Sequence, residues 1–205
     1  MATAERVLEI ARAEIGVKES PAGSNRVKYG SWYGLDGQPW CMMFVQWVFH
    51  HAGVPLPIRT ASCGALMKAA REAGQWVTRD FRPGDVVIYD FPGGAATDHC
   101  GIVEKVCGYN VAAIEGNTSM TGSQSNGGIV CRKTRPLGQI LGAVRPKHEE
   151  ERTMDNEPSP AHKEGVAWCL ERGILRGGPD GDLMLHAAVT REQMCTMLMR
   201  ALGGK

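Results

Sequence analysis

Apolar residues recur at helical spacing in three segments near the start of the chain. The first stripe ends at Gly16, and its spacing predicts an amphipathic helix. Its members are Val7, Leu8, Ala11 and Ile15. Pro39 suits the first position of a second helix, since its missing N–H is not needed there. This helix is expected to be apolar on most sides, to lie in the core and to end near Gly53. A third helix is predicted over residues 62–73.

After Gly74 the pattern changes to short runs of β-branched and apolar residues between Gly and Asn turns. The predicted strands are Val86–Tyr89, His99–Val106, Val111–Glu115, Gly128–Arg132 and Ile140–Val144. Helices followed by strands with short hairpin loops favour the α+β class, with N-terminal helices packed on an antiparallel sheet.

The pattern divides the chain of 205 residues into three parts. Residues 1–146 form the α+β domain, and residues 147–160, polar and proline-containing, form a linker. Residues 161–205 show a compact helix, turn and helix pattern, which predicts a small all-α module.

Composition narrows the possible partners and the compartment. The net charge of +1, from 23 basic and 22 acidic residues, gives no basic surface for nucleic acid. No apolar run is long enough to span a membrane. Charged residues such as Glu5, Arg6 and Glu9 interrupt the N-terminal apolar pattern, which is unlike a signal peptide. We therefore expect the protein to stay in the cytoplasm of the cell that makes it until it is released.

Seven cysteines without a Cys-x-x-Cys pair indicate reduced thiols rather than a disulfide framework or a paired-thiolate zinc site. Taken alone, Cys41 would be a core cysteine. If the helix starts at Pro39, however, Cys41 lies in its first turn, where free N–H groups and the helix dipole stabilise a thiolate. A nucleophilic cysteine also needs a histidine partner.

His99 is the best candidate among the six histidines. His50 and His51 lie roughly 14 Å along the helix from Cys41, at ~1.5 Å per residue, and the others lie in the linker and tail. A turn near residues 108–110 would bring His99 close to Glu115 and Asn117 across a hairpin. Because side chains alternate, a connection of odd length is needed to place all three on one face.

These motifs, namely Cys41 after Pro-Trp, Asp-His-Cys-Gly-Ile-Val-Glu with His99, and Ile-Glu-Gly-Asn-Thr-Ser with Glu115 and Asn117, resemble the CHAP family. CHAP proteins are cysteine- and histidine-dependent amidohydrolases and peptidases that cut peptidoglycan. The resemblance runs from Ile15 to about Val144. It implies a papain-like fold in which Cys41 is the nucleophile, His99 the base and then the acid, and Glu115 the residue that orients His99, with Asn117 sharing that role.

Other residues near Cys41 and His99 in sequence are candidates for contact with the substrate. The Cys41 N–H and Gln38 are candidate oxyanion donors, and Trp40, Trp32 and Asp98 are candidate substrate contacts, with aromatic core packing the alternative for the tryptophans. Some CHAP enzymes bind calcium through an Asp-rich loop before the cysteine. Asp36 is the only acidic residue among residues 25–38, so the sequence does not support a calcium site. We expect no metal and no cofactor.

The tail resembles one S-layer homology repeat, through Gly-Ile-x-x-Gly at 173–177, Asp-Gly at 180–181 and Thr-Arg-Glu at 190–192. The resemblance implies binding to cell-wall polymer, usually by three clustered repeats. A single repeat suggests a homo-oligomer, or extra tail copies translated separately from Met154, since residues 149–152 can be encoded by purine-rich codons of a ribosome site. A small helical dimerisation module is the alternative.

Taken together, these features predict a peptidoglycan amidase or endopeptidase, specifically a phage or prophage endolysin that lyses Gram-positive cells. The first alternative is a bacterial autolysin or toxin of the same chemistry. The second is a wall-binding protein that has lost catalysis.

Overall fold

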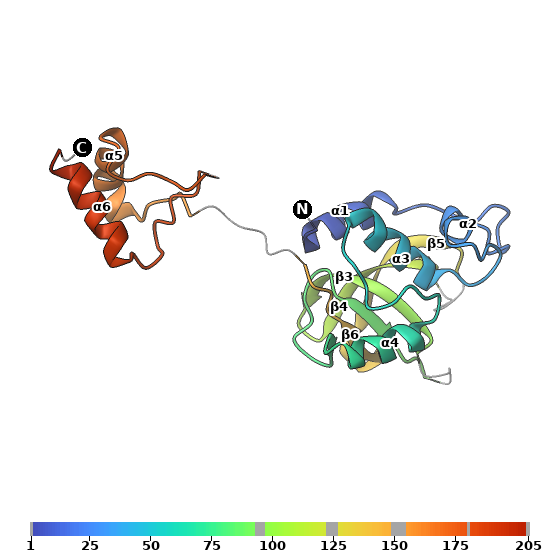
Figure 1. Ribbon diagram of the computed structural model, residues 1–205. Coiled ribbons are helices and arrows are strands. Elements are labelled where there is room, and N and C mark those ends of the chain that lie inside the picture. Colours follow the sequence, from blue (N-terminus) through green and yellow to red (C-terminus); the bar gives the residue numbers. More distant parts are fainter. Residues whose placement is uncertain (1, 93–96, 122–126, 149–154, 180, 204–205) are drawn as a thin grey trace. The chain divides into compact units, whose positions relative to one another are not determined.

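A computed structural model of the chain describes residues 2–92, 97–121, 127–148, 155–179 and 181–203. The chain divides into two compact units, Met1–Glu150 and Glu151–Lys205. The first unit combines helices with an antiparallel sheet (Figure 1), which confirms the predicted α+β class.

Six strands form one sheet in the order β1-β6-β2-β3-β4-β5, and every neighbouring pair is antiparallel. Their bounds are β1 Trp76–Val77, β2 Val86–Tyr89, β3 His99–Cys107, β4 Asn110–Thr118, β5 Ile129–Pro136 and β6 Ile140–Val144. The five predicted strands are present, and the two-residue β1 is additional. It pairs with β6 and is too short to show a period of its own.

The described residues of this unit form four α-helices, α1 Ala4–Ala13, α2 Lys28–Tyr33, α3 Cys41–Ala52 and α4 Cys63–Glu72, and a short 3₁₀ helix at Leu137–Gln139. The three predicted helices are present, although α1 ends before Ile15, which is 39% exposed. The sequence pattern did not predict α2, which has six residues and no side-chain N-cap.

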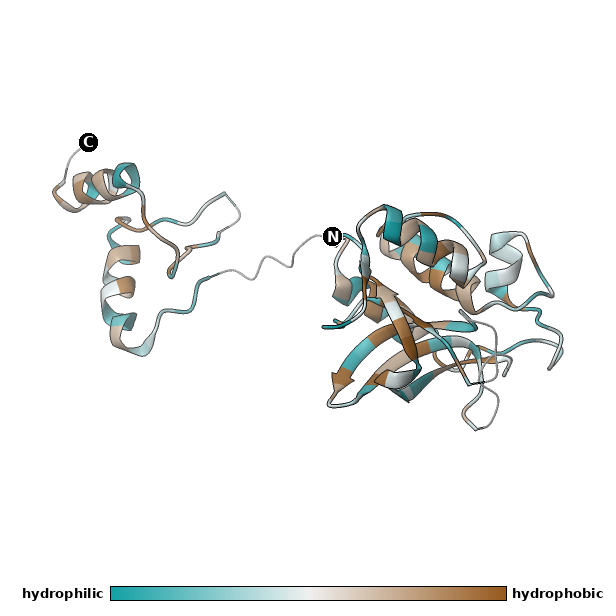
Figure 2. Cartoon of the chain, turned by 90° about the horizontal axis from the view of Figure 1, so that it is seen from below, coloured by the Kyte–Doolittle hydropathy of each residue, from teal (hydrophilic) through white to brown (hydrophobic). Residues whose placement is uncertain are grey.

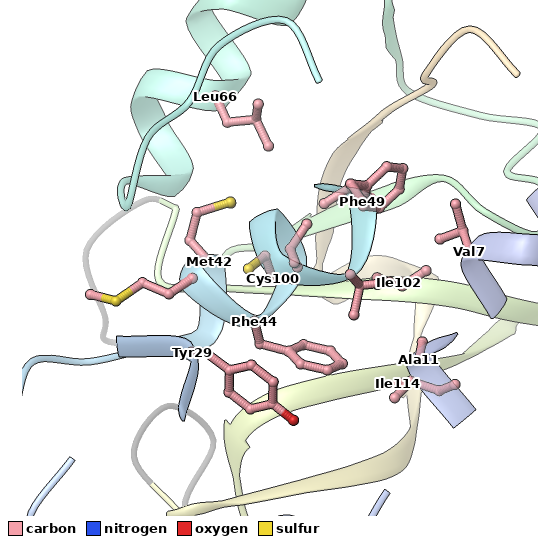
Figure 3. Packing of buried hydrophobic residues seen from close by; sticks show 14 of the residues in the cluster. Val7, Ala11, Tyr29, Met42, Phe44, Phe49, Leu66, Cys100, Ile102 and Ile114 are labelled. Carbon is pink, nitrogen blue, oxygen red and sulfur yellow. The ribbon is translucent and has the colours of Figure 1, made fainter. Parts of the chain in front are cut away.

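The sheet has an apolar cluster on each face. Helix residues such as Val7, Phe44 and Leu66 pack against Ile102 and Ile114 on one face. Figure 3 shows this packing, with Tyr29 of α2 beside Phe44 of α3. The second cluster includes Val87, Tyr89 and Val103. Figure 2 shows the resulting abundance of hydrophobic residues in the strands.

The second unit contains α5 Lys163–Glu171 and α6 Arg191–Ala201, with a short 3₁₀ turn at Pro160–His162. Helix α6 starts with a capping box between Thr190 and Gln193. Neither helix has a buried residue. Asp155 and Asn156, which we placed in the linker, hydrogen-bond within this unit to Asp182 and Gly181.

No helix in the described part of the chain combines the length and the hydrophobicity needed to cross a membrane.

Candidate active site

Cys41 is the first residue of α3 and is partly exposed. The prediction that Pro39 starts the helix is wrong, because Trp40 is the N-cap and has a non-helical backbone. Cys41 therefore lies even closer to the helix N-terminus than expected. The first N–H groups of a helix have no intrahelical acceptor, and the dipole there favours a negative charge.

Trp40 fixes the start of this helix. Its ring stacks on Tyr29 with centroids 5.4 Å apart, and its Nε1 donates to Glu19 Oε1 at 3.0 Å. The indole is 0% exposed, so the predicted substrate contact by Trp40 is wrong. The alternative of aromatic core packing describes this residue.

His99 and Glu115 meet in the interior of the domain. His99 is the first residue of β3, and its Nε2 lies 3.0 Å from Glu115 Oε2 in β4. Both side chains are 0% exposed. Gly101 makes room for the carboxylate, since a Cβ atom there would lie 2.8 Å from Glu115 Cγ.

A β-bulge places these two residues on the same face. The β3–β4 connection has two residues, with Cys107 paired to Asn110, and this even number alone would put His99 and Glu115 on opposite faces. The register shifts between Val103 and Lys105, so Glu104 is the extra residue that restores the parity. The prediction of a loop of odd length is therefore wrong, because the loop has two residues and the bulge at Glu104 supplies the change of face.

Arg135 of β5 completes a buried chain of charged groups. Its Nε and Nη2 donate to Glu115 Oε1 and Oε2 at 2.7 and 2.6 Å. The guanidinium lies 4.9 and 4.8 Å from the ring centroids of Tyr89 and Phe91. Burial acts to raise the pKa of Glu115, but hydrogen bonds from Arg135 and His99 outweigh it and keep the carboxyl pKa below its usual range.

Electrostatics favour a thiolate at Cys41 and a protonated His99. Hydrogen bonds from the Cys100 and Cys63 thiols lower the pKa of Cys41 well below its usual range against the effect of burial, and His99 adds to the shift. Burial acts to lower the pKa of His99, but the interactions with nearby Cys41 and with Glu115 outweigh it and raise this pKa to about 9. Each charge of the pair stabilises the other.

Asn117 does not join this arrangement through a hydrogen bond. It is buried with φ +54°, and its side-chain Nδ2 and Oδ1 have no partner among the described residues. The printed register of β3 and β4 ends at Ile102 and Ile114, and the pairing of β4 with β5 is irregular between Glu115 and Thr118. No hydrogen bond among the described residues therefore supports the orienting role that the resemblance implies for Asn117.

The three other candidates for substrate contact are Trp32, Asp98 and Gln38. Trp32, a candidate substrate contact, lies beside the C-terminal end of α3, with its ring 5.2 Å from that of His50. Asp98 accepts a hydrogen bond from the Phe91 N–H at 2.8 Å, which closes a loop. Gln38 is exposed, three residues before Cys41.

The part of the chain that the structure describes contains one group of residues suited to a metal ion, and it is not the loop considered for calcium. Asp36 there accepts a hydrogen bond from the Val27 N–H at 3.3 Å. The group consists of Cys41, Cys63 and Cys100, whose sulfur atoms all lie within 4.8 Å of one another.

The part of the chain that matches a known family model includes residues of this site. Residues 32–117 match the CHAP domain. The match contains Cys41, His99 and Glu115 and ends before Arg135. No curated protein is significantly similar to the chain.

The solved structures that resemble the chain include Ly7917 and an endolysin. Ly7917 is 18% identical with a TM-score of 0.44, over 70% of this chain and 62% of that one. The wild-type endolysin LysIME-EF1 is 18% identical with a TM-score of 0.45, over 73% of this chain and 67% of that one. The chain thus spans less than two thirds of the length of Ly7917.

Sequence reasoning missed Arg135, Cys63 and Cys100 as neighbours of the candidate active site. An arginine on the inner face of a strand is detectable only when the register of that strand is known. Cys63 is the first residue of α4, and no spacing rule relates it to Cys41.

Proposed function

We propose that the protein is a cysteine hydrolase that cleaves amide bonds of bacterial peptidoglycan. The observation that carries this proposal is the buried His99–Glu115 pair beside a thiol at a helix N-terminus. The CHAP match supports the substrate class. A wall-binding protein without catalysis would have no need for a buried, charged histidine next to a thiolate.

In the proposed reaction the Cys41 thiolate attacks the amide carbonyl carbon and forms a tetrahedral adduct. The protonated His99 then gives its proton to the leaving amine as the C–N bond breaks, which leaves a thioester on Cys41. Neutral His99 next takes a proton from water, which attacks the thioester and releases the carboxylic acid. Glu115 holds Nε2, so Nδ1 is the nitrogen that moves the proton.

The oxyanion of the adduct needs donors that are free before the reaction. The Cys41 N–H is the first N–H of α3 and has no intrahelical acceptor. Gln38 is the proposed second donor because it is exposed and close in sequence. Its side chain would have to turn toward the substrate carbonyl when substrate binds.

For the biological role, we propose a phage or prophage endolysin that acts on Gram-positive walls after release from the cytoplasm of the producing cell. Either the amide between muramic acid and the stem peptide or a bond within the stem or cross-bridge fits the chemistry of the site. A bacterial autolysin or toxin would use the same residues.

The test is digestion of purified Gram-positive peptidoglycan by the wild-type protein and by Cys41→Ala, followed by mass spectrometry. We expect new amine-bearing ends from the wild type only, and their masses distinguish amidase from endopeptidase. Cys107→Ala, which changes an exposed cysteine at the far end of β3, is the matched control and should cleave like the wild type. Equal cleavage by Cys41→Ala, or none by any of the three proteins, would contradict the proposal.

For the second unit, we propose binding to cell-wall polymer, strengthened by self-association or by tail copies translated from Met154. Met154 lies outside the described residues. Support for self-association comes from the exposed apolar side chains Trp168, Leu170, Met194, Leu198, Met199 and Leu202. Several linked tails would raise wall affinity through effective concentration. Silent replacement of a purine-rich codon before Met154 should remove a short tail band on expression, and unchanged bands would exclude separate translation.

A further inference from the structure

Three thiols converge at the candidate active site although the proposed reaction uses one. Cys41 begins α3, Cys63 begins α4, and Cys100 is the second residue of β3. Their sulfur atoms all lie within 4.8 Å of one another. Cys63 is 6% exposed and Cys100 0% exposed, and Figure 3 shows Cys100 pointing from its strand toward α3. Partly exposed Cys41 is the side of the cluster nearest solvent.

The spacing of the cluster suits a tetrahedral ion. With Zn–S bonds of about 2.3 Å, the sulfur atoms of a tetrahedral site lie roughly 3.8 Å apart. The sulfur atoms lie at most 4.8 Å apart, so each sulfur–sulfur distance would have to shorten by about 1 Å or less to bind the ion. A disulfide instead needs sulfur atoms at about 2.05 Å and would use only two of the three.

His99 is not part of the group of possible ligands within 4.8 Å of one another, which consists of the three cysteines. Its Nε2 contacts Glu115, while its Nδ1 is buried and has no hydrogen-bond partner among the described residues. With Nε2 occupied, Nδ1 is the nitrogen left to face Cys41.

We infer that Cys41, Cys63 and Cys100 form a site for a sulfur-preferring divalent cation such as Zn²⁺, with the fourth position open to water. Binding replaces the thiol protons of Cys63 and Cys100, which pass to solvent. It also occupies the electron pairs with which the Cys41 sulfur would attack a substrate. The ion thus acts as a reversible inhibitor of the site, a consequence that rests on the proposed hydrolase function.

The test uses the reduced full-length chain and Co²⁺ as a spectroscopic probe, followed by displacement with Zn²⁺. We expect one equivalent of Co²⁺ to produce a thiolate-to-metal charge-transfer band. Loss of even an outer partner weakens metal sites 10–100-fold, so Cys63→Ala and Cys100→Ala should each bind at least about 100-fold more weakly. Cys107→Ala is the matched control and should keep the band. Circular dichroism establishes that each variant is folded, and Cys63→Ser replaces Cys63→Ala if the latter is not.

The second readout is hydrolysis of peptidoglycan, with each protein compared with its own metal-free rate. Zn²⁺ should inhibit the wild type and Cys107→Ala, a chelator should restore both, and sensitivity should fall at least about 100-fold without Cys63 or Cys100. A missing charge-transfer band, or Zn²⁺ inhibition that is equal in Cys63→Ala and the wild type, would overturn the site. A loss of two hydrogens by mass, with no band in the reduced chain, would show a disulfide instead. An inactive protein that still gives the band would contradict the proposed function and leave the metal site standing.

Discussion

At the scale of single residues, the chemistry depends on charges that stabilise one another in a buried place. Cys41 lies at a helix N-terminus and next to His99, and the carboxylate of Glu115 fixes that histidine from the other side. Arg135 in turn neutralises Glu115. A buried ion survives only when it is paired and hydrogen-bonded, so each member of this chain depends on the next.

The first prediction concerns the reactivity of Cys41 at low pH. An ordinary thiol with a pKa of about 8.5 should alkylate roughly 50–100-fold faster at pH 8 than at pH 6, because only the thiolate reacts. The pKa of Cys41 is lowered well below its usual range, so its thiolate fraction falls less between pH 8 and pH 6, and its rate of labelling by iodoacetamide should change less than that of an ordinary thiol. Mass spectrometry of labelled peptides measures the rate, with a cysteine-containing model peptide as reference. Labelling of Cys41 that follows the reference would exclude an activated thiolate.

The second prediction concerns the buried pair of Glu115 and Arg135. Glu115→Gln leaves the guanidinium, whose side chain is 3% exposed, without its counter-charge. Removing one partner of a buried pair costs about 3–5 kcal/mol in the free energy of unfolding. Urea denaturation measures the loss. The double variant Glu115→Gln/Arg135→Met should be more stable than Glu115→Gln alone. If the losses in unfolding free energy of Glu115→Gln and Arg135→Met simply add in the double variant, the two groups are not coupled.

At the scale of elements, the position of α3 on the sheet sets the position of Cys41. β4 passes directly beneath the start of this helix at Gly116, where an added Cβ atom would lie 2.6 Å from Phe44 Cβ and 2.8 Å from the Trp40 ring. The neighbouring Glu115 points to the other face of the strand, toward His99. One strand therefore carries both the helix contact and the histidine partner.

Gly116→Ala should accordingly destabilise the fold and separate Cys41 from His99. Insertion of a methyl group into a filled core costs about 1–3 kcal/mol, measured as the free energy of unfolding in urea. Gly138→Ala is the matched control, because no atom lies within 4 Å of the Cβ position there. It should leave stability unchanged or raise it by a few tenths of a kcal/mol, up to about 1 kcal/mol. Equal stability of the two variants would contradict the close approach of α3 and β4.

The elements also show where a local pattern was sufficient. Helices α1, α3 and α4 and the strands β2 to β6 were predicted because each repeats its apolar residues over several positions. The short α2 and β1 were not predicted, because six and two residues are too few for a period to appear. The start of α3 was placed two residues too early, since Pro39 fits a first helical position in sequence but precedes the cap in the structure.

At the scale of the whole molecule, the two units differ in how they bury apolar surface. The first contains apolar clusters on both faces of its sheet. The second, Glu151–Lys205, has helices without a buried residue and exposes Trp168, Leu198 and Leu202 at 48%, 54% and 85%. Figure 2 shows hydrophobic segments in both of its helices. A unit of this size has little surface to bury by itself, which favours a partner.

Self-association should therefore depend on this apolar surface. Sedimentation of the full chain at rising concentration should show a mass above that of one chain, and Leu198→Ser/Leu202→Ser should shift it toward the monomer. Tyr109→Ser, which removes an 87% exposed side chain in the first unit, is the control and should sediment like the wild type. A wild type that stays monomeric at all concentrations would exclude association through the tail.

The sequence by itself determined the class of the fold, the order of its longer helices and strands, and the candidate residues Cys41, His99 and Glu115, because these follow from local periodicity and residue chemistry. It also led us to expect a connection of odd length between β3 and β4. Only the tertiary structure decided how His99 and Glu115 reach a common face, through a bulge at Glu104, and which residues from other elements join the site. Arg135 and Cys63 come from a later strand and a separate helix, so their contacts with Glu115 and Cys41 depend on register and packing. Those are set by the whole core, and no short stretch of sequence encodes them.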